Sequence, residues 1–228
     1  METKGLPREG LKLVACVTML LDHAGIGLFP SLWLRLIGRM AFPIYCFLLV
    51  EGVHYTRNAA KYGLRLFLVL ILSEIPFDLV VFGRITLAHQ SVMVTLLLGF
   101  FMLELGKKTD NFLLKILISL PFILLAEILH TDYGGHGVLL ILLLSLVRGL
   151  PHEGAATALV LLGVSLTMNS IPVPVFGLKI PIEIFSLLAM VPLSLYSGHR
   201  ATHSNALQWA FTLFYPAHLA VLALIRFT

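Results

Sequence analysis

Three observations predict that the chain folds as an all-α, polytopic bundle in a membrane. Of its 228 residues, 58% are hydrophobic and 12% are charged, which is about half of the charged fraction of an ordinary soluble domain. The mean hydropathy is +0.95. Apolar residues also fall in runs near the roughly 20 residues that a helix needs to cross a bilayer. These properties exclude nucleic-acid readers, cytosolic Rossmann enzymes and disordered linkers.

Nine apolar segments are candidates for membrane-crossing helices. The fourth and the sixth are short for a bilayer core of about 30 Å, so eight crossings, or one half-inserted segment, remain an alternative. No internal repeat or long linker divides the chain, and residues 1–228 are interpreted as one membrane domain. The segments are 11–29, 36–54, 62–82, 91–106, 112–130, 136–148, 155–171, 180–197 and 206–227.

The first three segments carry distinctive features. The first follows a basic start without a small-residue cleavage site, which predicts a retained span and not a signal peptide. In the second, Pro43 lies one turn after Arg39 and predicts either a packed kink or a helix that lines a polar pocket. In the third, Glu74 and Asp78 lie one turn apart around Pro76. Two carboxylates so close need a cation nearby, and Arg39 is the predicted partner.

The basic residues predict a cytoplasmic N-terminus. In that orientation eleven Lys and Arg residues lie at the inner ends and five lie outside, as the positive-inside rule requires. This excess accounts for the net charge of +4 without an acidic partner, and nine crossings put the C-terminus outside. The inner residues are Lys4, Arg8, Lys12, Arg57, Lys61, Arg65, Lys107, Lys108, Lys115, Arg148 and Arg200, and the outer ones are Arg35, Arg39, Arg84, Lys179 and Arg226.

Six of the predicted helices send ionisable residues to one layer on the outer side. A charged side chain at membrane depth costs a few kcal/mol, so such residues persist mostly where they pair or do chemistry. The structural alternatives are buried pairs that lock the bundle, in which Arg35 and Arg39 neutralise Asp22, Glu74 or Asp78, or side chains that reach the interface, but the cluster as a whole favours a site. It comprises Asp22, His23, Arg35, Arg39, Glu74, Asp78, Glu127, His130, Asp132, Glu183 and His218.

His23 is the predicted catalytic base of this layer. An imidazole exchanges protons near neutral pH, although a single histidine at a helix end is also typical of a hydrogen-bonded interface residue. Lys12 lies eleven residues earlier, which is close to three helical turns and a rise of about 16 Å. Lys12 and His23 therefore share one face of the first helix, with Lys12 at its inner end.

Motifs for other chemistries are missing from the sequence. It contains no P-loop, no GxSxG elbow and no HExxH motif, and Cys16 and Cys46 lie singly in apolar runs. His199 and His203 alone have a spacing of four, but they lie in a polar loop and not on a helix. We therefore predict no metal site.

Five segments resemble the TraX family of membrane acetyltransferases, whose type activity is N-acetylation of the pilin amino terminus. The basic-residue-then-histidine spacing also resembles the wider transmembrane acyltransferase superfamily, including the acyltransferase-3 proteins and the lysosomal heparan glucosaminide acetyltransferase. In the acyltransferase-3 motif arginine is common where this chain has Lys12. The five segments are LKLVACVTMLLDHAG, IGRMAFPIYCFLLVEGVHYTRNAAKYGLRL, LSEIPFDL, DYGGHGVLLILL and LFYPAHLAVLALI.

The resemblance implies a multi-pass enzyme of the bacterial cytoplasmic membrane that transfers an acyl group from acyl-CoA, expected to be acetyl-CoA, to an extracytoplasmic amine or hydroxyl. His23 would correspond to the catalytic histidine and Lys12 to the basic residue before it. Direct transfer and an acyl-histidine intermediate are both open. The partners would be acyl-CoA, membrane lipid and an acceptor such as a protein N-terminus, glycan or lipid, and not nucleic acid.

Each candidate residue then has an expected role. The rival hypotheses are a proton-coupled transporter or channel, and a non-catalytic scaffold for pilus or envelope assembly. A transporter or channel would have ionisable groups at several depths of the membrane, whereas in a scaffold the ionisable groups would only form structural pairs. In the acyltransferase hypothesis, the residues that hold the CoA phosphates are Lys12, Arg57, Lys61 and Arg65. His23 is oriented by Asp22, Glu74 or Asp78, and Arg39 either stabilises the oxyanion or pairs with those carboxylates. The residues expected on the acceptor side are Arg35, Asp132 and His218.

Overall fold

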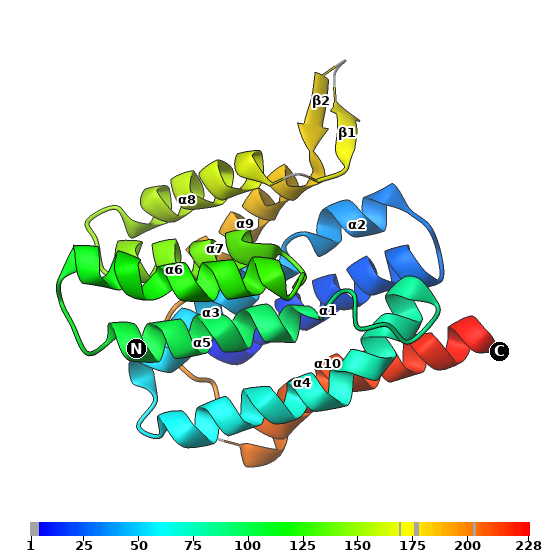
Figure 1. The fold of residues 1–228 in the computed structure, drawn as a ribbon, viewed down its shortest axis with the longest axis horizontal. Helices are drawn as coiled ribbons and strands as arrows, with labels where there is room; N and C mark the ends of the chain where they lie inside the picture. Colours follow the sequence, from blue (N-terminus) through cyan, green and yellow to red (C-terminus); the bar gives the residue numbers. More distant parts are fainter. Residues whose placement is uncertain (1–4, 169, 176–177, 203) are drawn as a thin grey trace.

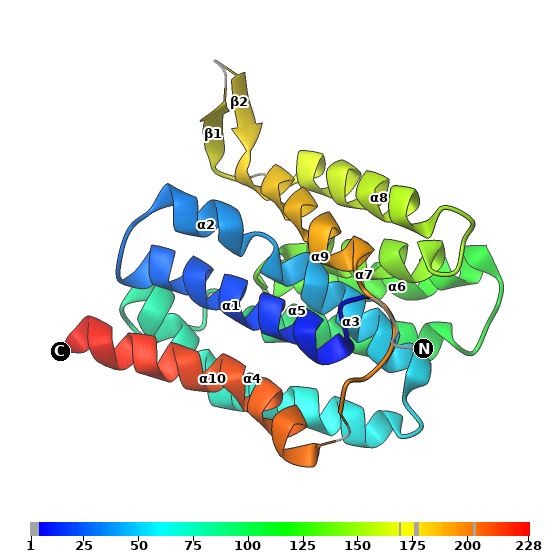
Figure 2. The same ribbon diagram turned by 180° about the vertical axis from the view of Figure 1, so that it is seen from behind.

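The computed structural model describes residues 5–168, 170–175, 178–202 and 204–228, and over these residues the chain is mainly helical. The helices form one bundle whose members run along its long axis (Figures 1 and 2). The helices are α1 (Arg8–Gly27), α2 (Leu32–Gly38), α3 (Ala41–Tyr55), α4 (Ala59–Phe82), α5 (Val92–Gly106), α6 (Phe112–Ile128), α7 (Gly134–Val147), α8 (Glu153–Thr167), the 3₁₀ helix η1 (Ile182–Ala189), α9 (Met190–Ser194) and α10 (Asn205–Phe227), and the strands are β1 (Pro172–Val175) and β2 (Leu178–Pro181).

The bundle has two distinct ends. The α1–α2, α4–α5 and α6–α7 links lie at one end together with the β1–β2 hairpin, and we call it the hairpin end. The α3–α4, α5–α6 and α7–α8 links lie at the other, which we call the basic end because Arg57, Lys107, Lys108 and Arg148 lie in or beside these links. The positive-inside rule predicts that the basic end is cytoplasmic.

Helix α3 occupies the middle of the bundle and is buried along most of its length. It packs on α1, α5, α7 and η1. The outer helices α4 and α6 instead carry rows of exposed large apolar side chains, such as Phe67 and Ile71 on α4 and Leu117 and Leu124 on α6. Apolar surface of this kind suits a lipid environment, where helices satisfy their backbone hydrogen bonds internally.

Three helical stretches are long and apolar enough to cross a membrane: Arg8–Gly27, Leu32–Tyr55 and Asn205–Phe227. The second combines α2 and α3. Helix α4 has 24 residues, but it carries four charged side chains along its length. The shorter apolar helices are Val92–Gly106, Gly134–Val147, Glu153–Thr167 and Ile182–Ser194. The protein is therefore a membrane protein with a largely helical fold, and nine crossings stay a prediction.

Each of the nine segments predicted from the sequence contains helix, but two of them differ in detail. The second segment breaks at Arg39 and Met40, between α2 and α3, and Pro43 lies in the first turn of α3. Pro43 has no N–H to donate to the carbonyl of Arg39 one turn earlier, so the helix is interrupted where a proline kink is expected, and the predicted kink is confirmed.

The eighth segment begins as the second strand of a hairpin that the all-α prediction does not include. Pro172 pairs with Pro181 and Val173 with Ile180. The prolines at 172, 174 and 181 oppose a helix here, and a two-stranded hairpin tolerates them because each of its strands has a free edge. The chain then continues as η1 and α9, which together replace the single predicted helix.

Cysteine labelling tests the orientation of the bundle. Ala88 is exposed in the α4–α5 link at the hairpin end, and Lys108 is exposed in the α5–α6 link at the basic end. We expect Ala88→Cys to react with a membrane-impermeant maleimide on intact spheroplasts, and Lys108→Cys to react only after permeabilisation. The unmodified protein is the control, since Cys16 and Cys46 are buried. The reverse labelling pattern would place the hairpin end in the cytoplasm.

Candidate active site

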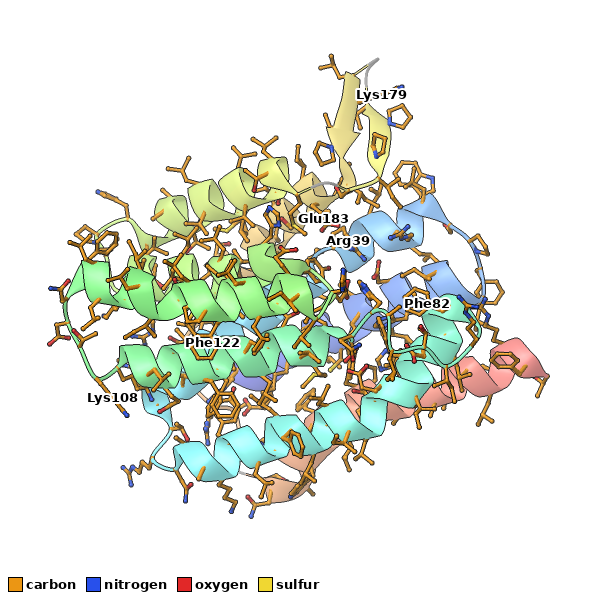
Figure 3. The ribbon with its side chains drawn as sticks, viewed as in Figure 1. Arg39, Phe82, Lys108, Phe122, Lys179 and Glu183 are labelled. Carbon is orange, nitrogen blue, oxygen red and sulfur yellow. The ribbon has the colours of Figure 1, made fainter. Side chains whose placement is uncertain are left out.

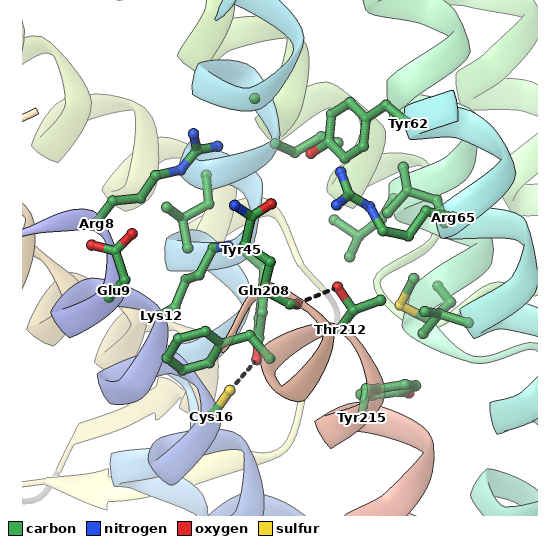
Figure 4. Close-up of a pocket in the computed structure, with 18 of the residues that line it drawn as sticks. Arg8, Glu9, Lys12, Cys16, Tyr45, Tyr62, Arg65, Gln208, Thr212 and Tyr215 are labelled. Atoms are coloured by element: carbon green, nitrogen blue, oxygen red, sulfur yellow. Dashed lines mark hydrogen bonds between the residues drawn. The ribbon is translucent and has the colours of Figure 1, made fainter. Parts of the chain in front are cut away.

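A cavity of about 220 Å³ lies between α1, α3, α4, α5 and α10. Helix α1 lines it with side chains three or four residues apart, which is the spacing of one helix face. These are Arg8, Lys12, Cys16 and Met19. Helix α10 lines it in the same way with Gln208, Phe211, Thr212 and Tyr215. Figure 4 shows the two helices on either side of the cavity.

The cavity changes character along its length. Four cations, Arg8, Lys12, Arg65 and Arg200, line it toward the basic end, where Glu9 is the single carboxylate. Aromatic faces support two of the cations, since Lys12 Nζ lies 5.5 Å from the ring centre of Phe211 and the Arg65 guanidinium lies 5.3 Å from that of Tyr62. Toward the hairpin end the lining is mostly apolar: Met19, Val69, Val92, Met93 and Leu96, with Tyr215.

Two histidines lie just beyond the deep end of this cavity. His23 is one turn past Met19 on α1, and His218 is one turn past Tyr215 on α10. His23 Nδ1 lies 2.9 Å from His218 Nε2, and both residues are buried. Tyr215 bridges the cavity and the pair, because its ring contacts that of His23 edge-on with centroids 6.1 Å apart.

The hydrogen bonds around the pair define which nitrogens carry protons when both rings are neutral. His218 Nδ1 lies 2.8 Å from the Phe214 carbonyl oxygen, which can only accept, so His218 Nδ1 donates. His218 Nε2 is then an acceptor, and His23 Nδ1 must donate to it. This leaves the lone pair of His23 on Nε2, the atom that a general base needs.

A second polar group lies at the hairpin end around Arg39. Its guanidinium donates to Asp22 Oδ2 from α1 and, at 3.1 Å, to Glu183 Oε1 from η1. All three residues are buried. The α1–α2 contact is close, since a Cβ on Gly38 would lie 2.3 Å from that of Asp22. Figure 3 labels Arg39 and Glu183 close together in the bundle.

Asp132 lies in the α6–α7 link beside this ion group. Its backbone is fixed at both ends, because its N–H donates to the Gln90 carbonyl at 2.8 Å and its carbonyl accepts from Thr95 Oγ1 at 2.5 Å. Burial raises the pKa of Asp132 to about 7; Arg39 opposes this shift, and Asp22 and Glu183 add to it. Asp132 thus carries a carboxyl that titrates near neutral pH.

The family model for the TraX protein matches residues 7–226, which is nearly the whole chain. The chain belongs to the TraX family. It is also 28% identical over 229 residues to the "Probable fimbrial assembly protein FimC, serogroup H1" of Dichelobacter nodosus, an alignment that covers 93% of this chain and 92% of the relative. No solved structure matches.

In this TraX-family chain the segments that resemble the family also build the candidate site. LKLVACVTMLLDHAG contains Lys12 and His23, and LFYPAHLAVLALI contains Tyr215 and His218. The two segments are far apart in the sequence, but α1 and α10 pack on each other. The sequence places His23 and His218 in the same outer layer, and the structure brings the two rings into contact. This contact, which the sequence did not predict, puts His218 beside the predicted base.

The predicted partnership of Arg39 with Glu74 and Asp78 is wrong. Glu74 Oε1 accepts from Ser91 Oγ at 2.6 Å, and Asp78 Oδ2 accepts from the Thr86 backbone N–H at 2.7 Å. The reason is packing: α2 lies on α1 and η1, whereas α4 lies on α10 and α5. Both carboxylates hold the α4–α5 link.

The predicted orientation of His23 by Asp22, Glu74 or Asp78 is also not what the structure shows. Asp22 is paired with Arg39, and His218 provides the hydrogen bond to His23. Adjacent side chains of a helix point about 100° apart, so Asp22 and His23 contact different neighbours on different sides of α1.

Two of the four predicted phosphate-binding residues lie outside the cavity lining. Lys12 and Arg65 line the cavity, but Arg57 and Lys61 are exposed in and after the α3–α4 link. Arg8 and Arg200 line it in their place. The sequence carried a signal for Arg8, which is one turn before Lys12 on the same face, and it carried none for Arg200.

The remaining predictions concern Arg35 and metal binding. Arg35 lies on α2, half-buried, one turn before Arg39, and among the described residues it makes no side-chain hydrogen bond or ion pair with His23 or Asp22. The described residues contain no group of three or more His, Cys, Asp or Glu suited to a metal. Lys4 and His203 lie outside the described residues.

Proposed function

We propose that this TraX-family protein is a membrane acyltransferase that uses acyl-CoA, with acetyl-CoA as the expected donor, to acylate an amine or hydroxyl. The observation that carries the proposal is one continuous arrangement: a cavity that is basic at one end, apolar at the other, and ends beneath the buried pair His23 and His218. Coenzyme A has the matching distribution, with phosphates at one end and a thioester at the other.

The cavity suits this donor in charge and in length. Arg8, Lys12, Arg65 and Arg200 offer four cations against the single carboxylate of Glu9, which favours a polyanionic group. Lys12 and His23 are separated by a rise of about 16 Å along α1, a distance that an extended pantetheine arm can span. A phosphate near Lys12 therefore puts the thioester near His23.

The proposed reaction uses His23 Nε2 as the general base. It removes the proton of the acceptor amine or hydroxyl as the nucleophile attacks the thioester carbonyl carbon. The tetrahedral intermediate then expels the CoA thiolate, and the imidazolium of His23 returns the proton to that sulfur. His218 accepts the hydrogen bond from His23 Nδ1 throughout and holds the ring in position.

The acceptor in this proposal is a protein or glycan on the hairpin side of the membrane. The relative from Dichelobacter nodosus is named a probable fimbrial assembly protein, and the family resemblance implies pilin as the type acceptor, so we propose a subunit of a surface fibre as the first acceptor to test. The hairpin end is the side on which such a subunit would meet the site if the basic end faces the cytoplasm.

Purified protein in proteoliposomes, given acetyl-CoA labelled in the acetyl group, tests the proposal. We expect release of free CoA and transfer of label to one member of a panel of amine-bearing peptides and sugars. A protein that neither binds CoA nor releases it would overturn the proposal. Proton flux without label transfer would point to a transporter, and neither activity would point to an assembly scaffold.

The cavity lining predicts which cations hold the donor. Replacing Arg65 by alanine should raise the Kd of CoA about tenfold or more, because a hydrogen bond to a charged group contributes about 1.5–3 kcal/mol. Lys61→Ala and Arg57→Ala are the matched controls, since both cations lie close in sequence but outside the lining. Titration calorimetry measures the three values, and equal losses in all three would contradict the assignment.

A further inference from the structure

The proposed reaction needs a hydrogen-bond donor for the thioester oxygen, and Arg39, the residue predicted from the sequence, does not supply it. When the nucleophile attacks, the thioester oxygen gains negative charge, and enzymes place a donor at that point. Arg39 was the candidate from sequence. Its guanidinium is bonded to Asp22 and Glu183, and Arg39 does not line the cavity that ends beneath His23.

Tyr215 has the properties of the missing donor. It lies at the deep end of the cavity on α10, only 5% of its surface is exposed, and among the described residues no group meets the distance and angle of a hydrogen bond to its hydroxyl. A buried hydroxyl without a partner is unusual, because leaving it unpaired costs about 1–3 kcal/mol. The hydroxyl of Ser91 lies near that of Tyr215, but it already donates to Glu74 Oε1 at 2.6 Å and can act toward Tyr215 only as an acceptor.

Two other hydroxyl groups of the cavity lining, those of Tyr45 and Thr212, are already engaged. Tyr45 lies 3.3 Å from Cys16 Sγ, and Thr212 Oγ1 donates to the Gln208 carbonyl at 2.8 Å. Tyr215 is also the tyrosine of the lining that contacts both histidines, with ring centroids 6.1 Å from His23 and 5.6 Å from His218. An acyl group that reaches His23 from the cavity must therefore pass beside the Tyr215 ring.

We propose that Tyr215 is a catalytic residue whose hydroxyl donates a hydrogen bond to the thioester carbonyl oxygen and stabilises the oxyanion formed there. This inference rests on the proposed acyltransferase function. The phenol stays protonated and donates without transferring its proton, so the proton balance of the reaction is unchanged. Tyr215 lies three residues before His218, and one face of α10 thus provides both the donor and the residue that positions the base.

The substitution Tyr215→Phe tests the role, because it removes the hydroxyl and keeps the ring. We expect kcat for acetyl transfer to fall about 10²- to 10³-fold, with the KM for acetyl-CoA and the Kd of CoA nearly unchanged. The melting temperature in detergent should not fall, since the hydroxyl makes no hydrogen bond that the variant would lose. Tyr196→Phe, which removes a phenol hydroxyl outside the cavity lining, is the matched control, and its kcat should stay within about threefold of that of the wild type.

The outcomes separate this inference from the proposed function. A wild-type protein that transfers acetyl groups, together with a Tyr215→Phe variant of equal kcat, overturns the role of Tyr215 and leaves the function standing. A variant that loses stability and CoA binding along with kcat shows a structural role and also overturns it. A wild-type protein without acyl transfer overturns the function and the role of Tyr215 together.

Discussion

Replacement of His23 by alanine is expected to lower the rate of acyl transfer by about 10²- to 10⁴-fold, because the variant lacks the proposed general base. Binding of CoA should change little, since His23 lies beyond the cavity lining that would hold the donor. The rate is measured with labelled acetyl-CoA and the binding by calorimetry. His54→Ala, which removes an exposed histidine at the basic end, is the control and should keep full activity.

The pairing of the two histidines makes the same experiment more specific. His218→Ala should also slow transfer, because His23 would lose the acceptor of its Nδ1 proton and with it the preferred orientation of its ring. If His218 acts through His23, the double variant should be hardly slower than His23→Ala alone, since residues that work as a unit are strongly non-additive. Additive losses, or wild-type turnover in His23→Ala, would contradict the assignment.

Hydropathy was sufficient to predict the helices and the membrane class, because long apolar runs have few alternatives. Helix geometry was sufficient to predict that Lys12 and His23 share a face, because a spacing of eleven residues places two side chains on one face of any regular helix. The hairpin at Pro172–Pro181 was missed because four-residue strands carry little periodicity. The break at Arg39 and Met40 agrees with the position of Pro43, which lacks the N–H that would bond to the Arg39 carbonyl.

The pairings inside the site could not be predicted, because they depend on which helices pack together. Arg39 has carboxylates from α1 and η1 as partners, and nothing in the sequence distinguishes Glu183 from Glu74 as its neighbour. The contact between His23 and His218 joins residues 195 positions apart. A layer of ionisable groups was visible in the sequence, but its division into an ion group around Arg39 and a histidine pair was not.

The second large effect is expected on stability, from replacing Arg39 by alanine. This substitution leaves Asp22 and Glu183 buried without their cation, and breaking a buried ion pair costs about 3–5 kcal/mol. We expect a much lower melting temperature in detergent and, through it, lower activity. Glu104→Ala is the control: its pair with Lys107 is partly exposed and should contribute less than about 1 kcal/mol, and Lys107 keeps its hydrogen bond to the Val53 carbonyl.

Two further variants separate lost pairing from lost chemistry at Arg39. Arg39→Lys keeps the charge but not the planar fork that reaches two carboxylates at once, so it should restore only part of the stability. The combination of Arg39→Met, Asp22→Asn and Glu183→Gln removes all three charges, and it should be more stable than Arg39→Ala because no unpaired charge is left buried. If Arg39→Ala instead keeps the wild-type melting temperature and loses only turnover, Arg39 acts in the reaction. In that case the ion group of Arg39, Asp22 and Glu183 does not hold α1, α2 and η1 together.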